Sequence, residues 1–163
     1  MAELTTLEAK LGEVVGLAMA AQEATQKVMK LPELEEDLAQ KLERMHEEAA
    51  EAERRGTELA GQYEGKKTAI LEEARETKSK AKEMLTTYLD EQSDALDGFE
   101  FLTMAEAGEV GHWSVLRKLN ERARRDDVQQ LVEWALPIQE RHFQAVLDGS
   151  LALAGAEDPN EPS

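Results

Sequence analysis

The chain has 163 residues, of which 41% are hydrophobic, 33% charged and 4% aromatic, and this composition is typical of one domain built from amphipathic helices. Its 35 acidic and 19 basic residues leave a net charge of −16, which argues against binding to nucleic acid or to an anionic membrane. Cysteine is absent, so disulfides, Cys-ligated zinc and iron–sulfur clusters are excluded, and His and carboxylate remain as metal ligands.

No apolar run approaches about 18 residues, and the first residues have no basic stretch followed by an apolar core. We therefore expect a soluble, cytoplasmic protein.

Apolar residues recur at helical spacing over residues 6–30, where Thr5 and Glu8 have the spacing of a capping box. A second helix is predicted over 33–60, with Pro32 in its first turn and acidic residues at its N-terminus. Because the link between them is short, the two helices should be antiparallel.

Residues 67–90 are helical in composition but weakly apolar, as expected for a surface helix that crosses between the ends of a bundle. Ser93 or Asp94 then caps a third core helix over 95–123. A fourth core helix is predicted over 127–150, with a kink at Pro137.

This order of elements predicts an all-α four-helix bundle with a long crossover connection that contains an extra helix. The bundle domain spans residues 1–154, and the acidic residues 155–163 are predicted to form a disordered tail.

The apolar stripe of the third core helix includes polar side chains. At about 100° per residue, Glu106, Glu109 and His112 all project within the stripe, with Glu109 close to its centre. An ionised carboxylate buried without a partner costs several kcal/mol, which a bound cation or a protonated imidazole can offset. The stripe therefore indicates a candidate site.

The last core helix has a similar feature, because its apolar stripe carries Gln139 and His142. In an antiparallel pair of the third and fourth core helices, facing residue numbers sum to about 250. Glu109 should then meet Gln139 and His142, and Trp113 should meet Trp134.

Together with the order of elements, three features resemble the ferritin-like superfamily: Glu43 and His46 at i, i+3, Glu109 on the third core helix, and Gln139 with His142 on the fourth. In particular, the chain resembles the small bacterial ferritin-like proteins that carry a fifth, connecting helix. The resemblance implies a ferritin-like bundle with a di-metal site for iron or manganese. It also implies a non-haem, redox or stress-related protein with dioxygen or peroxide chemistry.

In that family one Glu on the first helix, Glu-x-x-His on the second, Glu on the third and Glu-x-x-His on the fourth hold the metals. This chain has no Glu on the apolar stripe of its first helix. Glu43 lies about 120° from the centre of its stripe, so His46 is the better placed of that pair. Gln139 replaces the fourth-helix Glu, and an amide holds a divalent metal less strongly than a carboxylate does.

The candidate metal ligands share a place on, or beside, the apolar stripes. They are Glu109, His142, Glu106, His112, His46, Gln139 and Glu43.

Structural readings stay open beside the metal site. The acids could reach water at the rim of the stripe, or pair with His112, His142 or Arg117. Glu43 with His46 could be a solvated pair, and Gln139 a hydrogen-bonded core amide. The alternative function is accordingly a metal-free, degenerate ferritin-like bundle that acts as a structural or protein-interaction module. Whether the protein is an enzyme stays open.

A homodimer is a further hypothesis. Its motivation is the alanine-rich first helix, on which Val15 and Met19 present apolar surface beside the main stripe.

Overall fold

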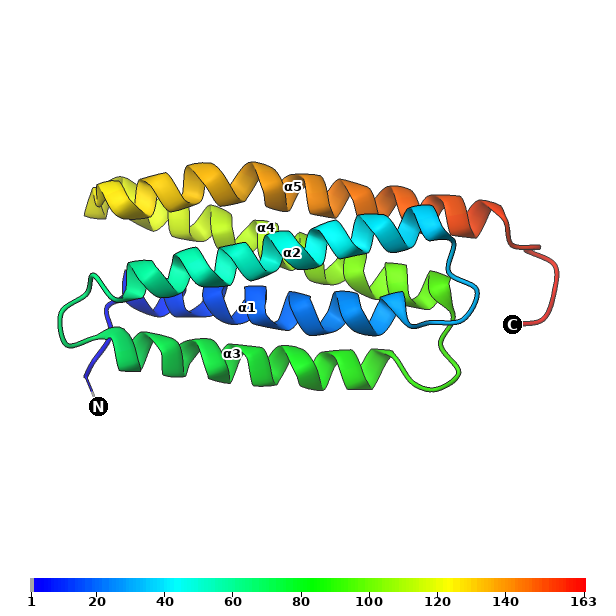
Figure 1. The fold of residues 1–163 in the computed structure, drawn as a ribbon, viewed down its shortest axis with the longest axis horizontal. Helices are drawn as coiled ribbons and strands as arrows, with labels where there is room; N and C mark the ends of the chain where they lie inside the picture. Colours follow the sequence, from blue (N-terminus) through cyan, green and yellow to red (C-terminus); the bar gives the residue numbers. More distant parts are fainter. Residues whose placement is uncertain (1) are drawn as a thin grey trace.

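The computed structural model describes residues 2–163 and contains five helices and no strand in that range (Figure 1). The helices are α1 Thr6–Met29, α2 Glu36–Ala60, α3 Lys67–Tyr88, α4 Ala95–Ala123 and α5 Asp126–Gly155. The predicted all-α class is confirmed. Over the same residues, no helix has both the length and the apolar character that crossing a membrane requires.

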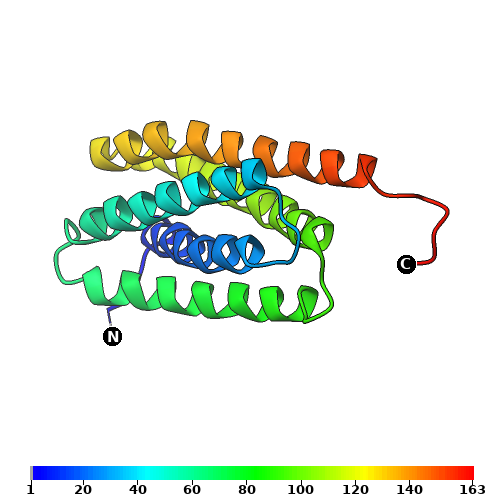
Figure 2. The same ribbon diagram turned by 45° about the vertical axis from the view of Figure 1, so that its right-hand side comes forward.

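The helices form two antiparallel pairs, α1 with α2 and α4 with α5, which pack together through α1 with α4 and α2 with α5 (Figures 1 and 2). In the sequence α3 connects the two pairs, and in the structure it runs along the outer side of α1. The chain therefore forms a four-helix bundle with a crossover helix, as the weakly apolar composition of α3 predicts.

Capping residues set the start of two core helices. The Thr5 hydroxyl accepts a hydrogen bond from the Glu8 N–H, and the Glu8 carboxylate accepts one from the Thr5 N–H. This confirms the predicted capping box of α1. Asp94 and Asp97 form the equivalent box at α4, so of the two predicted caps Asp94 is the correct one and Ser93 is not.

The predicted start of α2 is wrong. The helix begins at Glu36, and Pro32 lies in the preceding turn instead of in its first turn. The backbone at Glu33 has a φ of 62°, in the left-handed region. A residue in that conformation cannot continue a right-handed helix, so the chain reverses direction here before α2 can start.

The last helix is longer than predicted: α5 continues to Gly155 and runs through Pro137, which is exposed. The predicted kink at Pro137 stays a prediction. Residues 156–163 are exposed and contain a short turn at Asp158. Their predicted disorder also stays a prediction.

Two apolar clusters fill the bundle, one toward each end. The Trp113 core lies near the α4–α5 turn, and the Phe99 core lies near the α1–α2 turn. Val15 belongs to the Trp113 core and is 1% exposed, and Met19 packs against the same core. Val15 therefore packs against Gly56 of α2 within the bundle, and Met19 is partly buried. The homodimer stays a prediction.

Candidate functional site

A layer of polar side chains separates the two apolar cores. Glu106 and Glu109 come from α4, and Gln139 and His142 come from α5; their exposed fractions are 1%, 4%, 7% and 4%. We call these four residues the central polar cluster. The two acids are buried among helices, so the alternative in which they reach water at the rim is wrong.

An amide links the two carboxyl groups. Gln139 Nε2 donates to Glu109 Oε2 at 3.1 Å and also to Glu106 Oε2. The predicted contact between Glu109 and Gln139 is therefore confirmed, and the antiparallel register of α4 and α5 accounts for it.

His142 and its predicted neighbour Glu109 border the same small cavity, but no hydrogen bond or ion pair joins them. His142 Nδ1 lies 3.9 Å from Glu106 Oε2 instead. The reason is the register of the pair: His142 lies almost one turn beyond Gln139 on α5, so it faces α4 almost one turn before Glu109. One of the structural alternatives paired the buried acids with histidines. The structure contains one such pair, Glu106 with His142.

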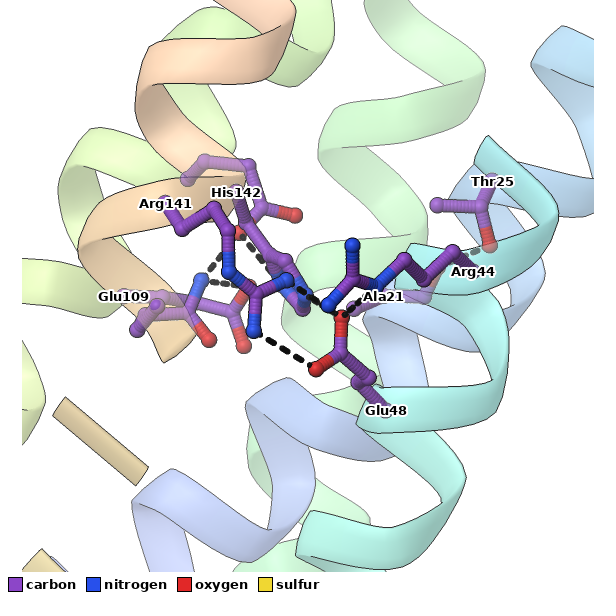
Figure 3. Close-up of polar contacts among 9 residues, drawn as sticks. Ala21, Thr25, Arg44, Glu48, Glu109, Arg141 and His142 are labelled. Carbon is purple, nitrogen blue, oxygen red and sulfur yellow. Dashed lines mark hydrogen bonds and ion pairs between the residues drawn. The ribbon is translucent and has the colours of Figure 1, made fainter. Parts of the chain in front are cut away.

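The other side of His142 meets Glu48 of α2, a residue absent from the predicted site. His142 Nε2 lies 3.2 Å from Glu48 Oε1, and Arg141 makes two hydrogen bonds to the same carboxylate at 2.8 and 2.9 Å (Figure 3). Arg44 also lies 3.4 Å from it. In the sequence, Glu48 follows Met45 of the apolar stripe by three residues, a spacing that places it on the inner side of α2. The Glu-x-x-His pattern instead favours Glu43.

Burial and charge set the protonation of these groups. Burial raises the pKa of Glu106 above its ordinary value, and burial together with the neighbouring Glu106 charge raises the pKa of Glu109 well above it. Burial also lowers the pKa of His142. In contrast, the hydrogen bonds from Arg141 lower the pKa of Glu48 to about 2. Burial therefore shifts both acids toward their protonated forms, while Glu48 stays ionised near neutral pH.

Three of the predicted ligands lie outside the central polar cluster. Glu43 is exposed on α2, as its angular offset from the apolar stripe suggests. His46 points to α1, where its Nδ1 lies 3.1 Å from the Gln22 carbonyl oxygen and 3.4 Å from the Thr25 hydroxyl. Glu43 and His46 thus point in different directions and do not form a shared metal-binding face.

His112 lies on the other side of α4 from His142. Its Nδ1 is 3.3 Å from Glu13 Oε2 and 3.2 Å from Lys10 Nζ, both on α1, and its side chain is 42% exposed. The pairing of His112 with a buried acid is therefore wrong. A broad stripe on α4 faces both α1 and α5, and His112 falls on the α1 side.

The two tryptophans lie beside the central polar cluster. Trp113 is 2% exposed in its core, and Trp113 and Trp134 border the same small cavity of about 10 Å³, together with Glu109, Gln139 and His142. The Arg55 guanidinium stacks over the Trp134 ring at 4.0 Å. Both tryptophans therefore act as packing for the cluster.

Within residues 2–163, no three His, Cys, Asp or Glu side chains are arranged as a group that could hold a metal ion. Even so, the donor types of the cluster fit one divalent ion, since two carboxyl groups and an imidazole are ligands that iron and manganese accept. From α1, the alanines Ala18 and Ala21 border the cavities beside the cluster, and no carboxylate of α1 lines either cavity.

Comparisons of the chain with family models, with curated proteins and with solved structures found no match.

Proposed function

We propose that the protein is a ferritin-like bundle whose central polar cluster binds a single divalent ion, iron or manganese. The observation that carries the proposal is the burial of two carboxyl groups side by side, Glu106 at 1% and Glu109 at 4% exposure. Such a pair is unfavourable when ionised unless a cation compensates it.

The roles follow from the contacts. Glu106, Glu109 and His142 would be the ligands, and the amide oxygen of Gln139 a weaker fourth donor. Glu48 orients His142 through the hydrogen bond to its second ring nitrogen, an arrangement that metal-bound imidazoles commonly have. The ion would supply Lewis-acid or one-electron chemistry.

Binding of Mn²⁺, measured calorimetrically in buffer without chelator, tests this function. We expect about one ion per chain for the natural protein and a large loss of affinity in Glu109→Leu. Glu43→Gln is the matched control, because Glu43 is exposed and lies outside the cluster; its affinity should be unchanged. No uptake of Mn²⁺ or of ferrous iron by the natural protein would reject the proposal.

A second candidate, the metal-free bundle, has its own supporting observation. The Gln139 amide donates to both carboxyl groups, and the raised pKa values of both acids favour a proton between them. The cluster would then be a closed hydrogen-bonded layer of a structural protein. This candidate predicts that Mn²⁺ leaves the melting temperature of the natural protein unchanged.

A further inference from the structure

A cavity of about 230 Å³ lies between α1, α3 and α4, on the side of the central polar cluster away from α5. Close approach of two helices limits it at one end: a Cβ at Gly16 of α1 would lie 2.3 Å from the Ala74 carbonyl oxygen of α3. Beyond this point alanines, among them Ala20 and Ala24, replace larger side chains on α1. The cavity is the space that these small residues leave open.

Most of the wall is apolar, and the opening lies between α3 and α4. Met84 of α3 and Met104 of α4 line the cavity and are 48% and 41% exposed. Phe101 closes the wall nearby and is 7% exposed. Apolar side chains therefore flank the entrance, and a ligand that enters meets apolar surface first.

The inner end of the cavity is acidic. Glu106 and Glu109 both line it, and Gln139, which donates to both, is a neutral partner. His112 also borders the cavity, but it is half-exposed and already lies beside Glu13 and Lys10. An apolar cavity thus ends on two buried carboxyl groups. The shortest distance from either of them to a basic side chain is the 3.9 Å between His142 Nδ1 and Glu106 Oε2.

We propose that this cavity binds a small apolar amine, with its apolar part against the alanines and its ammonium group against Glu106 and Glu109. The volume suits such a ligand, because a cavity of about 150 Å³ holds benzene and this one has room for a ring and a short arm. An ammonium supplies several N–H donors and the positive charge that the acid pair lacks. The net charge of −16 also favours the approach of cations.

The inference goes beyond the proposed metal binding and does not depend on it. An ammonium and a divalent ion would use the same two carboxyl groups, so they should compete. The amine is therefore tested in excess chelator, where failure of the metal proposal has no effect on the result.

The experiment is a calorimetric titration of the full chain with benzylamine, alongside toluene and benzyl alcohol as neutral ligands of similar shape. Benzylamine should bind at least about tenfold more tightly than either neutral ligand, because its ammonium group can make charge-assisted hydrogen bonds to the two carboxyl groups. In Glu109→Leu this preference should disappear.

Two glycines of α4 provide a matched pair of variants for the cavity. A Cβ at Gly108 or at Gly111 would meet no atom within 4 Å, so both Leu substitutions are compatible with folding, but only Gly108 lines the cavity. Gly108→Leu should weaken benzylamine binding at least about tenfold, and Gly111→Leu should leave it unchanged. Equal binding of benzylamine and benzyl alcohol, or equal effects of the two glycine variants, would overturn the proposal.

Discussion

The Trp113 core and the central polar cluster lie next to each other in the bundle but are built differently. The core packs fully buried Leu, Val and Trp side chains from four core helices and α3, whereas the cluster places carboxyl groups beside alanines. Burial stabilises the first and costs free energy in the second. Burial of the acids therefore does not add to the stability of the bundle, and this is why we propose a ligand for them.

The largest effect should come from the core. Trp113→Ala removes a fully buried side chain, and we expect a loss of about 3–5 kcal/mol in the free energy of unfolding. Urea denaturation followed by circular dichroism measures it. Val115→Ala is the control, because Val115 is 45% exposed on the same helix. This substitution should lower the free energy of unfolding only slightly. A similar loss in both variants would show that the core is not packed as described.

The cluster should respond in the opposite direction. In excess chelator Glu109→Leu removes the cost of burying an acid and adds apolar contact, so the free energy of unfolding should rise by about 1–3 kcal/mol. The same denaturation experiment reports it. Destabilisation by Glu109→Leu would instead indicate that the hydrogen bond with Gln139 outweighs the cost of burial.

The pH dependence of stability should distinguish the two regions further. The pKa of Glu106 is raised to about 7 and that of Glu109 is also raised, so protonation of both is favoured in the folded state. Both contributions are complete below the ordinary pKa near 4.5. That of Glu106 is lost as pH rises through about 7, and that of Glu109 is lost at pH values well above 4.5.

We therefore expect the chelated natural protein to lose about 3 kcal/mol or more between pH 4.5 and 8 relative to Glu106→Gln/Glu109→Gln, because the raised pKa of Glu106 alone corresponds to about this amount. The difference between the two proteins isolates the pair from His142, whose lowered pKa acts in the opposite sense by reducing stability as pH falls. Parallel pH profiles of the two proteins would mean that the acids titrate normally and are accessible to water.

The smallest effect is expected at the edge of the cluster. Glu48→Gln removes the charge that Arg141 and His142 share, but the site is partly solvated, so the loss should be below about 1 kcal/mol near neutral pH. Because the pKa of Glu48 is lowered to about 2, its contribution is present above about pH 4.5 and is lost as pH falls toward 2. A denaturation series over this range checks it, with Glu43→Gln as the control.

The fold was predictable because its signals are local. Helical spacing, the Thr5 capping box and the short links define the core helices, and the weak apolar stripe of α3 identifies the crossover. The turn before α2 was missed, since the left-handed backbone at Glu33 leaves no clear signal in a Glu-rich stretch. The register of α4 and α5 predicted the contact of Gln139 with Glu109 because a two-residue link, Arg124 and Arg125, fixes it.

The contacts of the other site residues could not be predicted, because they depend on which helix packs against each face of α2, α4 and α5. His112 and His142 both fall on apolar stripes, yet one faces α1 and the other faces α2 and α4. The angular position of a residue on its own helix does not decide this. Glu48 was missed for the same reason, because its partners Arg141 and His142 are 93 and 94 residues away in the chain.

The central claim, that the buried acids are present to hold a cation, is tested most directly by four melting temperatures. They are those of the natural protein and of Glu109→Leu, each measured in excess chelator and in excess Mn²⁺. We expect the melting temperature of Glu109→Leu in chelator to be higher than that of the natural protein. Mn²⁺ should raise the melting temperature of the natural protein alone, so that in Mn²⁺ the natural protein melts at the higher temperature. A natural protein that melts at the same temperature with and without Mn²⁺ would contradict the claim.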